Sequence, residues 1–214
     1  MEFLAQLIDI VLHLDRYLSE FLSTYGTWAY ALLFAIIFAE TGFVITPFLP
    51  GDSLLFVAGT LAAGSGLDVQ ILIPLLIAAS FGGDNTNYWI GYHLGPRILR
   101  RSDSWLLNRK HLDRTHAFYE KHGGKTILLA RFLPIVRTFA PFVAGIGRMP
   151  YIRFLIFSFA GSVLWITLFV LGGYYFGHLE WVRKNLTLVM LGIIIVSILP
   201  GVIAWLRHRL SRPT

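Results

Sequence analysis

Long apolar runs with few polar interruptions dominate this chain, and they predict helices that cross a membrane. Two runs, at residues 154–177 and 186–206, carry no charged side chain, and each exceeds the roughly 20 residues that a spanning helix needs. A third run, at residues 69–95, contains one acid, Asp84, which we expect to face other helices instead of lipid. The pattern therefore predicts three transmembrane helices.

Two further apolar runs are interrupted by charged residues and prolines. Residues 28–66 contain Glu40, Pro47, Pro50 and Asp52, and residues 124–147 contain Arg131, Pro134, Arg137 and Pro141. Proline removes a backbone N–H donor and breaks a helix, and a broken helix is tolerated at membrane depth only where protein or a water-filled cavity surrounds it. Both runs are therefore predicted to be re-entrant helical hairpins, each of which enters and leaves at the same membrane face.

The basic loops orient these elements. The segment from residue 96 to residue 125 has eight basic and three acidic residues, and the C-terminal tail carries Arg207, Arg209 and Arg212. Because basic loops stay in the cytoplasm, both segments are predicted to be cytoplasmic. Residues 97–122 are interpreted as a basic amphipathic segment on that side, and residues 1–25 as an amphipathic N-terminal helix. The first hairpin then enters from the periplasmic face and the second from the cytoplasmic face.

Composition agrees with a membrane protein. The 214 residues are 56% hydrophobic and 14% charged, and the mean hydropathy is +0.65, so the chain is predicted to be one all-α, polytopic membrane domain. In a soluble protein the net charge of +6 would suggest nucleic acid, but here the cytoplasmic loops carry it, so no nucleic-acid partner is expected. The absence of cysteine excludes disulfides, thiolate metal sites and thiol nucleophiles.

Short motifs recur in the same order in the two halves of the chain. FLSTYG at residues 21–26 resembles FYEKHG at 118–123, FVAG at 56–59 recurs at 142–145, and GYHLG at 91–95 corresponds to GYYFG at 173–177. One net crossing separates the two hairpins, so the copies are predicted to be inverted relative to each other. Inverted repeats with broken helices are the architecture in which many transporters place a binding site near the membrane midplane.

Four charged side chains within the broken runs are the primary candidates for a functional site. They are Glu40, Asp52, Arg131 and Arg137. A charge at bilayer depth costs about 2.5–3.5 kcal/mol on insertion scales, so it persists mainly where it is paired, solvated or functional. Guanidinium groups stay charged and bind phosphate oxygens bidentately, which suits an anionic lipid headgroup, and the acids would exchange protons or hold the arginines. The alternative is that all four are structural ion pairs between the hairpins.

Four more polar residues are secondary candidates for the same cavity. Asp84 and Asn87 lie one helical turn apart, so they would either face the cavity or form a local packing network. Ser53 follows Asp52, and Thr138 follows Arg137. These hydroxyls would be the nucleophiles if the chain were an intramembrane polyprenyl diphosphate phosphatase. Neither has a histidine nearby in the sequence and no phosphatase motif is present, so no enzymatic activity is expected.

Four further motifs resemble those of a known family. They are ETG at residues 40–42, PFLPGDSLLFVAG at 47–59, GDNTNYWIG at 83–91 and ARFLPIVRTFAPFVAG at 130–145. With these motifs the chain resembles the DedA family of bacterial inner-membrane proteins, which shares its membrane domain with eukaryotic lipid scramblases of the VTT type. The resemblance implies a transporter that moves undecaprenyl phosphate, or in some members phosphatidylethanolamine, across the membrane with dependence on the proton-motive force. It also implies that the essential acids and arginines fall on the four primary positions.

The expected function is therefore that of a lipid flippase in the bacterial inner membrane, multi-pass and with a cytoplasmic C-terminus. Its partners would be a lipid phosphate and the surrounding lipids, and small-residue runs such as 91–95 leave a homodimer open. No cofactor is expected apart from the proton as coupling ion, and no metal, because the histidine spacing matches no zinc motif. Besides the phosphatase, the alternative is a non-catalytic membrane scaffold, which would tolerate neutral replacements at Glu40 and Arg137.

Overall fold

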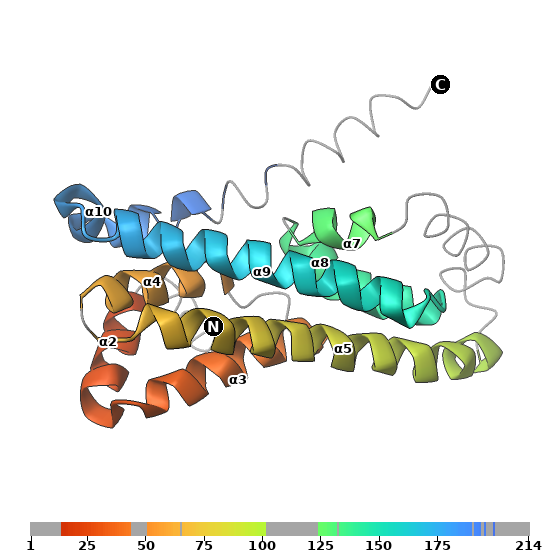
Figure 1. Cartoon of the computed structure of the whole chain (residues 1–214). Helices are drawn as coiled ribbons and strands as arrows, with labels where there is room; N and C mark the ends of the chain where they lie inside the picture. The colour runs from red at the N-terminus through yellow and green to blue at the C-terminus, as the bar shows by residue number, and fades with distance from the viewer. Residues whose placement is uncertain are drawn as a thin grey trace, which may run out of the picture. The chain divides into compact units, whose positions relative to one another are not determined.

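The computed structural model describes residues 14–43, 51–64, 66–101, 124–131 and 133–189, with positions 191–193, 195 and 199. These residues form helices and turns and contain no strand, so the prediction of an all-α chain is confirmed for them (Figure 1). The helices are α2 (Leu14–Tyr25), α3 (Trp28–Gly42), α4 (Gly51–Ala63), α5 (Val69–Arg101), α7 (Lys125–Ala130), α8 (Pro134–Ile146), α9 (Tyr151–Phe176) and α10 (Glu180–Lys184).

Several sequence predictions fall outside the described residues. They concern the first part of the N-terminal helix, the stretch with Pro47 and Pro50, the basic segment after Arg101, most of the span predicted at 186–206, and the C-terminal tail.

Each of the two proline-containing runs forms a pair of short helices. In the first run α3 has 15 residues and α4 has 13, and in the second α7 has six and α8 has 13. None of the four reaches the length of about 20 residues that a spanning helix needs. Helix α8 begins at Pro134, where a missing N–H and a fixed φ are compatible with the first helical position.

The expectation that Pro141 also interrupts its run is wrong. Pro141 lies inside α8, which continues to Ile146. A proline at this position removes a single N–H donor from the hydrogen-bond ladder. The remaining bonds of the helix persist on both sides of it, because their donors and acceptors belong to other residues.

The chain divides into two compact units. Unit 1 contains the described parts of Met1–Leu33, Pro50–Leu75 and Ile166–Thr214, and unit 2 contains those of Phe34–Leu49 and Leu76–Trp165. Helices α3, α5 and α9 pass from one unit into the other. Within unit 1, α2 packs on α4, and within unit 2, α7 packs on α8.

In unit 2, helices α5 and α9 pack side by side in an antiparallel direction. The rings of Phe81 and Phe159 meet edge to face at 5.6 Å, and the Tyr151 hydroxyl donates to Asn85 Oδ1 at 2.8 Å. Because residue numbers rise along α5 as they fall along α9, the two helices run in opposite directions. The core beside them contains Tyr88, Ile127, Ala144, Met149 and Phe154. This packing positions one face of α5 and one face of α9 around the candidate site.

The recurring glycine motifs make the same helix crossing in both units. In unit 1 a Cβ atom on Gly59 would lie 2.1 Å from the Val170 carbonyl oxygen, and one on Gly173 would lie 1.9 Å from that of Phe56. In unit 2 a Cβ atom on Gly145 would lie 2.1 Å from the Tyr88 carbonyl oxygen, and one on Gly91 would lie 2.1 Å from that of Phe142. At each crossing the two backbones touch, which only glycine permits. The FVAG motif of each copy thus packs at the GYxxG motif of the other copy, GYYFG at 173–177 or GYHLG at 91–95.

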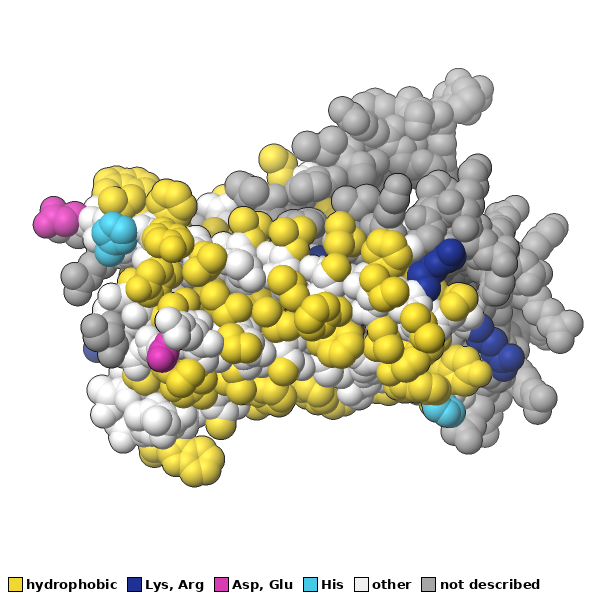
Figure 2. All heavy atoms as spheres, viewed as in Figure 1, with side chains coloured by type: hydrophobic (Ala, Val, Ile, Leu, Met, Phe, Trp, Pro, Cys, Tyr) yellow, Lys and Arg dark blue, Asp and Glu magenta, His cyan; other side chains and the backbone are white. Residues whose placement is uncertain are grey.

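The described surface is apolar where a soluble protein would be polar. Hydrophobic side chains cover much of the face seen in Figure 2, and the exposed ones on α9 include Ile152, which is 73% exposed, together with Ile156 and Phe159. Polar side chains such as Ser158 and Ser162, on the same helix, are fully buried. Among the described helices α9 alone is long and apolar enough to cross a membrane. An apolar exterior around a polar interior is what a lipid environment favours.

Candidate functional site

A buried ion pair joins α3 to α8 within unit 2. Glu40, in the last turn of α3, accepts a hydrogen bond on Oε1 from Nη2 of Arg137, in the first turn of α8. Both side chains are buried, Glu40 completely. Removing one partner of such a pair leaves an uncompensated charge in a dry environment, which costs about 3–5 kcal/mol of folding stability. Each partner therefore requires the other in this arrangement.

A second buried ion pair joins Arg131 to Asp84. Arg131 follows the end of α7, and its Nη2 donates to Oδ2 of Asp84, in the middle of α5. The two primary arginines are therefore each held by a carboxylate. Glu40 is one of the primary candidates, whereas Asp84 was expected only as a secondary one.

Three serines complete the surroundings of Arg131. Its Nη1 donates to Ser80 Oγ at 2.7 Å and its Nη2 donates to Ser162 Oγ at 2.8 Å. Ser158 Oγ donates to the Asp84 carboxylate at 2.5 Å, and its carbonyl oxygen lies 3.4 Å from Arg131 Nη2. We call Ser80, Ser158 and Ser162 the serine cage. It places hydroxyls from α5 and α9 around one guanidinium group and its carboxylate.

One aromatic ring contacts both arginines. The guanidinium carbon of Arg137 lies 4.6 Å from the centre of the Trp165 ring, and that of Arg131 lies 5.7 Å from it. Cations within about 6 Å of an indole face are attracted by the ring, and more strongly where water is excluded. Trp165 is almost completely buried, so the two ion pairs meet at a dry aromatic surface.

Asn87 links α5 to the end of α3 and to α8. Its Nδ2 donates to the carbonyl oxygen of Thr41 at 3.0 Å and to that of Thr138 at 2.7 Å. Its Oδ1 is buried without a hydrogen-bond partner in the part of the chain that the structure describes. Of the two alternatives left open for Asp84 and Asn87, Asn87 therefore performs the packing role, and Asp84 pairs with a primary site residue.

Asp52 and Ser53 belong to unit 1, where they lie in the first turn of α4. Both are buried. Ser53 Oγ has no hydrogen-bond partner within the described residues. The other six predicted residues, which are Glu40, Asp84, Asn87, Arg131, Arg137 and Thr138, meet in unit 2.

Several contact residues were missed by the sequence interpretation. The serine cage, Trp165 and Gly161 all contact the arginines, and a Cβ atom on Gly161 would lie 2.9 Å from Arg131 Nε. Ser158, Ser162 and Trp165 are spaced at i, i+4 and i+7, which places them on one face of α9. That spacing was a usable signal, but serine and tryptophan are ordinary in membrane helices.

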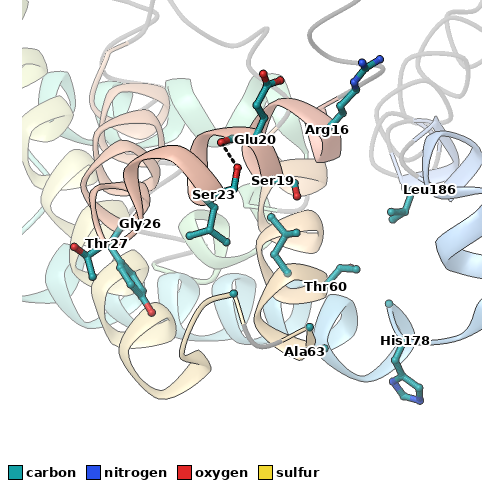
Figure 3. Close-up of a pocket in the computed structure, with 16 residues that line it drawn as sticks. Arg16, Ser19, Glu20, Ser23, Gly26, Thr27, Thr60, Ala63, His178 and Leu186 are labelled. Carbon is teal, nitrogen blue, oxygen red and sulfur yellow. Dashed lines mark hydrogen bonds between the residues drawn. The ribbon is translucent and has the colours of Figure 1, made fainter.

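Unit 1 contains a separate cavity of about 1400 Å³ whose lining mixes apolar, polar and charged residues (Figure 3). One wall is the face of α2 that carries Arg16, Ser19, Glu20 and Ser23, and the opposite wall includes His178. Its described lining includes none of the eight candidate residues.

The arrangement in unit 2 contains two guanidinium groups, each paired with a carboxylate. Among the described residues no three histidine or acidic side chains approach closely enough to hold a metal ion. The two arginines and two carboxylates balance in formal charge. An anion that displaced a carboxylate would find a guanidinium already oriented to receive it.

The sequence matches one family model and several known proteins. No solved structure matches it. Residues 49–175 match the VTT domain. The chain is 53% identical over 211 residues to Protein DedA of Escherichia coli (strain K12), covering 98% of this chain and 96% of that protein. It is 42% identical over 188 residues to an uncharacterized membrane protein of Mycobacterium leprae, covering 86% and 84%. It is 34% identical over 171 residues to the inner membrane protein YghB of Escherichia coli (strain K12), covering 79% and 77%.

Proposed function

The chain belongs to the DedA family of VTT-domain membrane proteins, and from this membership we propose that it moves a lipid with an anionic phosphate headgroup across the bacterial inner membrane. Undecaprenyl phosphate is the proposed cargo, and a related phospholipid is the next candidate. In this proposal the protein is a transporter and not an enzyme, and the proton is its only coupling ion.

The observation that carries this proposal is the pair of buried arginines that share Trp165. Each guanidinium is held by a carboxylate and lies against the same aromatic ring. Ionised side chains within membrane helices mark substrate or ion pathways more often than they serve as structure alone. A lipid phosphate must bring a negative charge through hydrocarbon, and arginine is the side chain that keeps its charge there and binds phosphate oxygens with two donors.

The short paired helices support a site inside the bilayer. Helices α3, α4, α7 and α8 are too short to span, so we propose that each pair enters and leaves at one membrane face as a re-entrant hairpin. The identical glycine crossings of the two FVAG motifs support an internal repeat, which we propose to be inverted. Such repeats allow a site to open alternately to either side.

Proton coupling is proposed to act through the carboxylates. An acid that is paired with arginine is held in its ionised form, and the same acid accepts a proton more readily once phosphate takes the arginine. In this scheme Glu40 gains a proton when Arg137 binds the headgroup and releases it when the ion pair forms again. Asp52 remains a proposed site residue in unit 1, where it is buried in α4.

The test is transport by purified protein in liposomes. Wild-type protein is expected to move labelled undecaprenyl phosphate between leaflets, and the Arg131→Ala and Arg137→Ala variants are expected to insert but to lose at least about 90% of the rate, since each removes about 1.4 kcal/mol or more of headgroup stabilisation. Arg153→Ala is the matched control, because Arg153 is an exposed arginine in the first turn of α9.

Three results would point away from this proposal. If both arginine variants transported lipid at the wild-type rate, the two arginines would have no role in transport. Release of inorganic phosphate from undecaprenyl diphosphate would favour the phosphatase, with Ser53 or Thr138 as the nucleophile. The scaffold alternative would be favoured by two results together: the protein moves no lipid, and cells grow normally when Glu40 and Arg137 are replaced by neutral residues.

A further inference from the structure

The surroundings of Arg131 resemble a phosphate-binding site more than a simple ion pair. The guanidinium is held in place by two hydroxyl acceptors, Ser80 Oγ at 2.7 Å and Ser162 Oγ at 2.8 Å. The Ser158 hydroxyl points instead at the carboxylate and donates to it at 2.5 Å. A guanidinium and a hydroxyl that converge on one anionic group form a pattern of donors that suits an oxyanion in general.

Asp84 accepts from only some of the hydrogen-bond donors of the Arg131 guanidinium group. One carboxylate oxygen, Oδ2, receives both the Arg131 Nη2 and the Ser158 hydroxyl. Arg131 Nε is buried and makes no hydrogen bond within the described residues. Nε and Nη2 are the two donors that arginine uses for bidentate binding, so the present pair leaves half of that fork empty.

Glycine at position 161 places no side chain against the unused donor, which is nevertheless buried. A Cβ atom there would lie 2.9 Å from Arg131 Nε and 3.2 Å from its Cδ. Any larger residue would cover this edge of the guanidinium or push it aside. The unsatisfied N–H and the missing side chain beside it are two separate observations on the same edge.

We infer that the Asp84 carboxylate is the resting occupant of an oxyanion site on Arg131, and that the phosphate of the transported lipid enters by displacing it. This inference rests on the proposed function and adds the residue that competes with the substrate. A phosphate monoester has three terminal oxygens, so it engages Nε, Nη2 and the Ser158 hydroxyl together. Asp84 returns when the headgroup leaves, and its return expels the phosphate. Asp84 is thus a positioning residue that sets both affinity and release.

The displacement predicts opposite effects on binding and on transport. A protein whose site is occupied by its own carboxylate binds ligand with an affinity reduced by the fraction of time that the site is closed. Asp84→Asn keeps the shape of the side chain and removes its charge, so it leaves Arg131 available. We expect dodecyl phosphate to bind about tenfold more tightly to this variant and lipid transport to be about tenfold slower, because release has lost its competitor.

Titration calorimetry on the full chain in nanodiscs, with liposome transport alongside, tests this. The probes are dodecyl phosphate and inorganic phosphate, and the matched control is Asp68→Asn, the same change at an exposed acid in unit 1. Tighter binding with slower transport supports the inference. Binding that is unchanged or weaker in Asp84→Asn overturns it, because a purely structural carboxylate would show that result together with a lower melting temperature. Equal affinity for the two probes would overturn the assignment of a lipid headgroup.

A second variant keeps the test decisive if Asp84→Asn does not fold. Ser162→Ala removes a hydroxyl that orients Arg131 but keeps both charges, and it is expected to weaken dodecyl phosphate binding about fivefold with little change in melting temperature. Unchanged binding would count against the site. If wild-type protein neither binds nor transports a lipid phosphate, the proposed function itself fails. If it does both and the two variants bind like wild type, only this inference fails.

Discussion

Trp165 connects the two ion pairs of the site through a single ring. The guanidinium groups of Arg131 and Arg137 lie 5.7 Å and 4.6 Å from its centre, and the ring is buried. Two like charges near one another repel, and the electron-rich face of an indole reduces that cost without adding a formal charge. A cation–π contact is less directional than a hydrogen bond, so in the proposed mechanism it would persist while an arginine exchanges a carboxylate for a phosphate.

Replacement of Trp165 by leucine is therefore expected to impair transport more than folding. Loss of the cation–π contact removes about 0.5–2 kcal/mol of support for the arginines, so we expect a rate roughly two- to thirtyfold lower in the liposome assay. Trp165→Phe keeps an aromatic face and is expected to retain an intermediate rate. A leucine variant with the wild-type rate would show that the ring only fills space.

Single residues of the site were predictable to the extent that their chemistry is unusual in a membrane. Glu40, Asp84, Arg131 and Arg137 are charged residues in apolar runs, and the cost of burying them marks each one in the sequence. The serine cage could not be found in this way, because a serine hydroxyl satisfies itself by bonding to its own helix, as Ser162 does to the Ser158 carbonyl. Which acid holds which arginine was also beyond the sequence, since it depends on tertiary packing.

At the scale of helices, glycine contacts determine how α4 meets α9 and how α8 meets α5. The repeated motifs were visible in the sequence and predicted close packing. The sequence did not reveal that the FVAG motif of one copy packs on the GYxxG motif of the other, because that pairing joins residues more than 50 positions apart. In both units the contact atoms are backbone carbonyls, so the crossing cannot adjust by moving a side chain.

A single methyl group at either crossing should force the helices apart. Gly145→Ala and Gly59→Ala each place a Cβ atom 2.1 Å from a carbonyl oxygen, and overpacking of this kind costs about 1–3 kcal/mol. For a chain of this size we expect the melting temperature in detergent to fall by roughly 2–12 °C. Gly192→Ala is the control, because no atom lies within 4 Å of a Cβ atom built there. Equal melting temperatures for all three variants would contradict the observed crossings.

At the scale of the whole chain, the membrane topology stays a prediction, and it can be related to residues that lie together inside each unit. Thr27, Gly66 and His178 are far apart in the sequence and are all predicted to be periplasmic, and all three line the cavity of unit 1. In unit 2 the Arg148 guanidinium lies 5.5 Å from the centre of the Tyr92 ring, and both residues are predicted to lie near the cytoplasmic surface. A wrong orientation of either hairpin would place residues from opposite faces in the same contact.

Cysteine labelling tests that topology directly, because the chain has no cysteine of its own. Thr27→Cys and His178→Cys introduce thiols at exposed positions of the unit 1 cavity, and Arg153→Cys introduces one at an exposed position of unit 2. A membrane-impermeant maleimide added to spheroplasts is expected to label the first two variants, and to label the third only after lysis. If Thr27→Cys and His178→Cys were labelled from opposite sides, one of the two hairpins would have to cross the membrane. The charged residues of that run would then lie on an ordinary spanning path, and alternating access between two inverted hairpins would lose its structural basis.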